Sequence, residues 1–121
     1  MSKITITPQI MKSIAKGTIF VATGGYDANF ADFFKVVGKT AKSVKVVQIG
    51  KKRVSSGNNC MEYGQVVADP SVIESQPKTL RIRAYEWGRE INVSFSTESF
   101  HSIGSSAFVW SGQPINEYNY H

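Results

Sequence analysis

Two neighbouring segments alternate strictly between apolar and polar side chains, and this alternation constrains the fold most. Every second side chain is apolar in residues 80–85, and residues 91–95 repeat the pattern after the turn Glu86–Arg89. A repeat of two residues is that of a strand with one face in the core. Pairing across the four-residue turn places Ile82 opposite Val93. The sequence therefore predicts an antiparallel hairpin with a single apolar face.

The rest of the chain from Gly17 onward is also typical of β-structure. Short apolar segments predict strands over 18–23, 33–38, 43–49, 64–68, 107–110 and 115–118. The spacers Lys39–Lys42 and Ser111–Pro114 predict two more hairpins. The 121 residues suit one domain. We expect a mainly β fold: a compact, strongly bent antiparallel sheet or small barrel with a short N-terminal helix.

Residues 1–16 are predicted to be an N-terminal appendage that contains this helix, and residues 17–121 a single β domain. Thr7 is suited to the N-cap, Pro8 to the first helical position and Gly17 to the C-terminal stop. A helix of little more than two turns is stable only when it is docked on something.

The charge of the chain is concentrated in one stretch. The net charge is +5, and residues 35–53 hold seven basic side chains and no acidic one. Such a field favours a polyanion or an acidic partner. The alternative is that these lysines solvate an edge strand and block aggregation. The seven residues are Lys35, Lys39, Lys42, Lys45, Lys51, Lys52 and Arg53.

Strand alternation predicts where the side chains of the basic hairpin point. Lys35 and Lys45 are expected on a common outer face, and Lys39 and Lys42 at the turn. The inward set comprises Phe34, Val36, Val44 and Val46.

A second group of candidate residues lies on the alternating hairpin. Arg81, Arg83 and Tyr85 are predicted on its polar face, with Trp87 at the turn. An exposed aromatic beside arginines is a stacking platform for single-stranded bases or an anchor for a protein partner. The alternative is that Trp87 folds back over the core.

A third group offers a weaker, catalytic interpretation. Tyr26 and Asp27 follow two glycines, and Asp32 lies five residues further on. Two carboxylates at this spacing suit a metal or an acid/base pair in a small hydrolase or transferase. Nothing downstream completes such a site, so we expect no enzyme, no catalytic residue, no metal and no cofactor.

Several motifs together resemble a group of small proteins encoded by bacteriophages and mobile elements. The group shares a Gly-x-Ile-Phe strand, a Gly-Tyr-Asp loop, an Asp-Phe-x-x-Val strand and a Trp-x-Gly-x-Pro turn. The corresponding segments here are Lys16–Val21, Gly25–Asp27, Asp32–Val37 and Trp110–Pro114, with Thr40–Gly50 and Val66–Pro70 between. Gly24 stands where the group often has tryptophan. The resemblance implies an accessory protein of no settled biochemical activity.

These observations support three alternative functions. The first is non-catalytic binding of nucleic acid through the basic hairpin. The second is inhibition or modulation of a host protein, such as a defence-system nuclease, in an anti-CRISPR-like role. The third is the catalytic interpretation. We expect a cytoplasmic location in a bacterial host without membrane contact, because the N-terminus has no apolar leader and no apolar run approaches a spanning length. A homodimer is left open.

Overall fold

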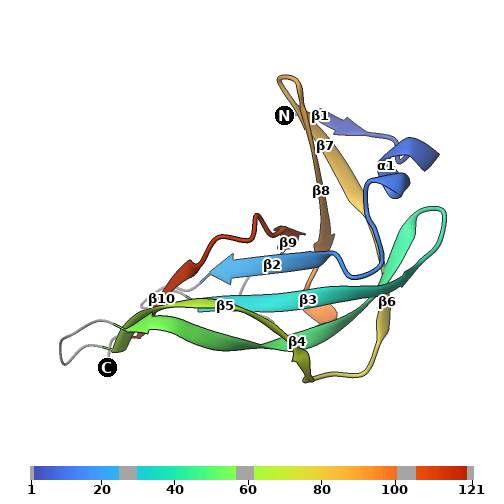
Figure 1. Cartoon of the computed structure of the whole chain (residues 1–121). Coiled ribbons are helices and arrows are strands. Elements are labelled where there is room, and N and C mark those ends of the chain that lie inside the picture. The colour runs from blue at the N-terminus through green and yellow to red at the C-terminus, as the bar shows by residue number, and fades with distance from the viewer. Residues whose placement is uncertain (1, 25–29, 57–61, 101–105, 120–121) are drawn as a thin grey trace.

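The structure is a computed structural model that describes residues 2–24, 30–56, 62–100 and 106–119. These residues form ten strands of one antiparallel sheet, one short helix and a single 3-10 turn (Figure 1). The elements are β1 (Ser2–Ile4), α1 (Pro8–Lys12), β2 (Ile19–Gly24), β3 (Phe30–Lys39), β4 (Ser43–Ser56), β5 (Glu62–Ile73), β6 (Lys78–Arg81), β7 (Arg83–Trp87), β8 (Glu90–Ser96), the turn η1 (Glu98–Phe100), β9 (Ser106–Val109) and β10 (Ile115–Asn119).

The sheet follows the order β1-β7-β8-β9-β2-β3-β4-β5-β10, and β6 pairs with β4 beside this path. The predicted mainly β fold with a bent antiparallel sheet and a short N-terminal helix is confirmed. Among the described strands the path ends at β1 and β10, so the structure is a bent sheet rather than a barrel. Figure 1 shows the β7–β8 hairpin standing away from the long β3–β4–β5 body, with β1 beside it.

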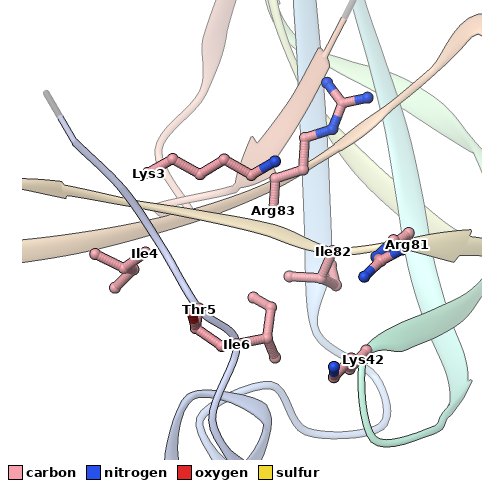
Figure 2. Close-up of a pocket in the computed structure, with 8 residues that line it drawn as sticks. All are labelled: Lys3, Ile4, Thr5, Ile6, Lys42, Arg81, Ile82 and Arg83. Carbon is pink, nitrogen blue, oxygen red and sulfur yellow. The ribbon is translucent and has the colours of Figure 1, made fainter.

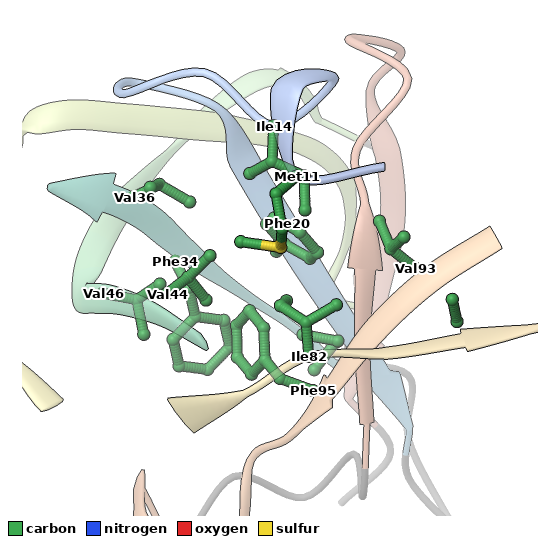
Figure 3. Packing of buried hydrophobic residues seen from close by; sticks show 13 residues of the cluster. Met11, Ile14, Phe20, Phe34, Val36, Val44, Val46, Ile82, Val93 and Phe95 are labelled. Atoms are coloured by element: carbon green, nitrogen blue, oxygen red, sulfur yellow. The ribbon is translucent and has the colours of Figure 1, made fainter. Parts of the chain in front are cut away.

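The bend allows the sheet to bury both of its faces in the β2–β3–β4 region. Phe34 lies on one face and Phe33 on the other. The first core comprises Met11, Ile14, Phe20, Ala22, Phe34, Val36, Val44, Val46, Ile82, Ala84, Val93, Phe95 and Ala107 (Figure 3). The second core comprises Ala31, Phe33, Val47, Ile49, Val66 and Ala68, with Trp110 and Ile115 packed against it. The predicted inward set of the β3–β4 hairpin is therefore confirmed.

The N-terminal segment is part of the first core. Thr7 caps α1, its hydroxyl accepting from the Ile10 amide at 3.2 Å, as predicted. Helix α1 is only five residues long, and Met11 and Ile14 are buried against the sheet. Burial of these side chains supplies the docking that so short a helix requires. The strand β1, which sequence analysis missed, attaches residues 2–4 to β7.

The predicted register of the alternating hairpin is wrong by two residues. Val93 lies opposite Ala84 instead of Ile82, and Trp87 pairs with Glu90. The loop is therefore the two residues Gly88-Arg89, and Gly88 adopts a φ of 61°. Glycine reaches this left-handed conformation without strain, which permits a tight two-residue connection. A shift of two residues keeps every side chain on its predicted face.

The alternating segment 80–85 is split into two strands. Residue Ile82 separates β6 from β7, and the two strands pair with different neighbours, β4 and β8. The segment crosses from one part of the bent sheet to another at this point. Its apolar side chains Ile82 and Ala84 still enter the first core, as the alternation predicted.

The predicted hairpin across Ser111–Pro114 is not formed. Strand β9 pairs with β2 and β8, whereas β10 pairs with β5. The chain between them crosses the second core, where the Trp110 ring packs edge-on against Phe33 at 5.2 Å. The Trp110 indole N–H donates to the Gln113 carbonyl at 2.8 Å and closes the turn locally. In the described ranges, no helix has the length and apolar character needed to cross a membrane.

Candidate nucleic-acid interface

Three segments that are remote in sequence meet in one pocket of about 560 Å³. They are residues 3–6 of the N-terminal segment, Lys42 at the β3–β4 turn, and residues 81–83 between β6 and β7 (Figure 2). We call this the basic pocket. It is lined by Lys3, Ile4, Thr5, Ile6, Lys42, Arg81, Ile82 and Arg83.

Of the eight described residues that line the pocket, four are basic and none is acidic. The apolar part of the lining comes from Ile4, Ile6 and Ile82, of which Ile82 is buried and the other two half-buried. A cluster of cations beside a low-dielectric wall concentrates the positive field. The pocket is therefore chemically suited to phosphate groups of a polyanion.

Local structure positions Lys42, Arg81 and Arg83. The turn after β3 is closed by the Thr40 amide, which donates to the Ser43 carbonyl at 2.8 Å. The Ile82 amide donates to the Lys42 carbonyl at 3.0 Å and ties the turn to the crossing strand. Because Ile82 points into the core, strand alternation turns Arg81 and Arg83 outward.

The outward face continues along β7 as a row of basic and aromatic residues. Arg83, Tyr85 and Trp87 share this face, and Trp87 is 62% exposed. The alternative in which Trp87 covers the core is wrong. Lys3 lies directly opposite Tyr85 in the β1–β7 pair. Lys3 and Tyr85 therefore belong to the same face.

The basic run of residues 35–53 does not form one surface with the pocket. Only Lys42 of its seven cations lines the pocket. Lys35 is half-buried between Ile19 and Val47, and Lys45 is exposed opposite Gly38 and Thr79. Alternation places both on the face opposite the first core, as predicted, but beside Lys35 this face is not an outer one, because Phe33 and Val47 bury it in the second core.

Two lysines of the run donate hydrogen bonds to backbone carbonyls of other segments. The Lys39 ammonium donates to the carbonyls of Met11 and Ile14 at 2.8 Å each. It thereby satisfies acceptors at the C-terminal end of α1, where a cation is favoured. The Lys51 ammonium donates to the Ala31 carbonyl at 2.9 Å. These two residues have structural contacts that the sequence did not predict.

The remaining cations of the run, Lys52 and Arg53, lie far along β4 from the turn. Arg53 is eleven positions beyond Lys42, a separation of order 35 Å along an extended strand. Beside them, the pKa of the Asp69 carboxyl is lowered, chiefly because the Ser71 hydroxyl donates to it at 2.5 Å. The Ser71 amide and the charge of Lys52 act in the same direction. An ionised carboxylate on β5 therefore lies beside this part of β4.

The described residues do not bring the three candidate catalytic residues together. Asp32 lies in β3 opposite Ala22, while Tyr26 and Asp27 are outside the described residues, as is most of the Gly24–Asp27 loop. Within the described ranges, no three His, Cys, Asp or Glu side chains are grouped as metal ligands.

A second groove also borders the N-terminal segment, and none of the described residues that line it is charged. Its volume is about 860 Å³, and it runs between residues 4–13 and strands β8 and β9. Three of its apolar residues are about half exposed: Ile91, Phe108 and Val109. Exposed apolar side chains gathered in a groove are typical of interaction surfaces.

Sequence analysis missed Lys3 as a site residue. The signal that would have found it is the alternation of Lys3-Ile4-Thr5-Ile6, which has the two-residue repeat of a strand.

Comparison with known proteins adds no assignment: no family model, no curated protein and no solved structure matches the chain.

Proposed function

We propose that this protein binds nucleic acid without catalysing a reaction, and that it does so at the basic pocket. The observation that supports this most is the convergence of Lys3, Lys42, Arg81 and Arg83 in one pocket that has no acidic lining residue. We therefore centre the proposed binding surface on the basic pocket and not on residues 35–53. Cations in such a cluster contact phosphates and position the ligand without reading sequence.

The proposal includes a biological setting, which is supported by the sequence motifs alone. The resemblance to small phage and mobile-element proteins suggests an accessory protein acting in the cytoplasm of a bacterial host. In that setting, a protein that occupies nucleic acid would compete with host factors for it. The proposed function requires no binding partner other than nucleic acid.

Two single substitutions that each remove one positive charge test the proposal. Lys42→Gln removes a cation of the pocket, and Lys45→Gln removes an exposed cation three residues away that does not line it. Fluorescence anisotropy with labelled DNA and RNA would be measured at about 50 and 200 mM salt, where phosphate contacts lose most affinity. Lys42→Gln is expected to weaken binding to all sequences alike and to reduce the slope of log K against log salt by about 0.7–0.9.

Lys45→Gln is expected to leave both affinity and slope close to those of the unchanged protein. The absence of any binding at the lower salt concentration would overturn the proposal. Equal loss in the two variants would show that net charge, rather than the pocket, determines binding.

A second candidate function is binding to a host protein, such as a nuclease of a defence system. The uncharged groove with its exposed Ile91 and Phe108 favours it, because aromatic and aliphatic side chains commonly anchor protein partners. Ile91→Ser and Phe108→Ser are then expected to abolish nuclease-resistant, stoichiometric capture of one host protein, while Lys42→Gln retains it. Capture that disappears on nuclease treatment would instead indicate a nucleic-acid bridge.

A further inference from the structure

We infer that the nucleic acid bound at the basic pocket is single-stranded, and that it runs from the pocket along β7 with bases stacked on Tyr85 and Trp87. This inference rests on the proposed function and adds the class of ligand and its path. It follows from the register of three neighbouring strands, which aligns cations and aromatic rings on one face.

The cations and the rings form a single line. Arg83, Tyr85 and Trp87 occupy alternate positions of β7, so their side chains share its outward face, and Arg81 precedes them at the end of β6. From Arg83 to Trp87, this row spans about 13 Å of strand. Arg81 and Arg83 line the basic pocket, and the aromatic residues continue away from it. A ligand that fills the pocket with phosphate therefore meets the rings next.

The surroundings of Tyr85 suit a base that stacks beside its own phosphate. Lys3 is directly opposite Tyr85 on β1, and Asn92 is directly opposite on β8. The half-buried ring is thus flanked by a cation on one side and an amide on the other. Stacking of this kind tolerates any base, because every base offers a π-face.

The far end of the row disfavours a duplex. Glu90 pairs with Trp87 across the β7–β8 hairpin and is exposed on the same face. A second phosphate backbone passing there would meet this carboxylate, whereas an uncharged base over the indole would not. The bases of a duplex are also stacked on one another, so they cannot use Trp87 unless they are unstacked at a cost.

The test compares single strands with a duplex of the same sequence and follows Trp87. Labelled oligonucleotides of about 12 residues, as single-stranded DNA, single-stranded RNA and duplex DNA, would be titrated at about 50 mM salt. Single strands are expected to bind more tightly than the duplex. Trp87→Ala is expected to weaken single-strand binding by about 5- to 150-fold, the loss of one stacked base, and Trp87→Phe to retain most of the affinity.

Ile73→Ala is the matched control for this test. Ile73 is 54% exposed on β5 and lines neither the basic pocket nor the second groove. Its loss is expected to leave single-strand affinity unchanged. The single-stranded DNA and RNA arms show which of the two sugars the site accepts.

The outcomes separate this inference from the function on which it rests. Equal binding of duplex and single strand that still depends on Lys42 would overturn the inference and retain the proposed function. Unchanged single-strand affinity in Trp87→Ala would do the same. Failure of all three ligands to bind would overturn both.

Discussion

Phe33 and Phe34 are adjacent in β3, yet their rings lie in two different cores on opposite faces of the sheet. Phe34 packs against Phe95 with ring centroids 5.7 Å apart, and Phe33 packs against Trp110 at 5.2 Å. Both side chains are at most 1% exposed. The bend of the sheet makes this possible, because it brings strands over both faces of β3.

The two cores are expected to respond independently to mutation. Phe34→Leu and Phe95→Leu remove one aromatic contact within the first core, so a double-mutant cycle should give a coupling of about 0.5–1.5 kcal/mol. Phe33→Leu and Phe95→Leu are in different cores and should be additive within about 0.5 kcal/mol. Urea unfolding monitored by circular dichroism measures each free energy. Strong coupling of Phe33 with Phe95 would contradict the separation of the cores.

Lys39 is expected to contribute to stability. Its ammonium donates to the carbonyls of Met11 and Ile14, and hydrogen bonds from a charged donor contribute about 1.5–3 kcal/mol when sheltered. Because Lys39 is itself exposed, Lys39→Ala should lower the free energy of unfolding by about 1–2 kcal/mol. Lys45→Ala serves as the control and should change it by at most about 0.5 kcal/mol. Amide exchange in residues 8–14 should also accelerate in Lys39→Ala alone.

Gly50 is expected to resist substitution by alanine, whereas Gly38 is not. A Cβ added at Gly50 would lie 2.8 Å from the Val72 Cβ, so β4 and β5 would have to move apart. Overpacking of this kind costs about 1–3 kcal/mol. A Cβ at Gly38 would make an ordinary contact of 3.6 Å with the Lys45 Cβ. Thermal unfolding should show a lower midpoint for Gly50→Ala and little change for Gly38→Ala.

The carboxyl of Asp69 is expected to titrate below its ordinary pKa of 3.8, because the Ser71 hydroxyl donates to it. A carboxyl whose pKa is lower in the folded state than in the unfolded state stabilises the folded state at pH values above the unfolded-state pKa. This contribution is lost as the pH falls through the folded-state pKa. Ser71→Ala should raise the pKa of Asp69 toward 3.8. Carbon-13 NMR titration of the carboxyl measures it. Ser71→Thr keeps the hydroxyl and should keep the pKa low; equal values in both variants would contradict the assignment.

Local periodicity predicted correctly which side chains enter the first core, and it did so even where the pairing was wrong. The inward positions of Val36, Val44 and Ile82 follow from a repeat of two residues. The N-cap at Thr7 follows from local hydrogen-bonding chemistry in the same way. These properties depend on a residue and its near neighbours, so the sequence by itself determined them.

The tertiary structure alone decided which segments meet. The bend of the sheet gave β9 and β10 separate partners. The same bend brings Lys3 and Lys42 to Arg83, although about 40 residues separate each from the next. No local repeat contains such long-range contacts, because they depend on how the whole sheet buries its two faces. The lysine run therefore indicated the sign of the charge, and the fold decided which cations form the basic pocket.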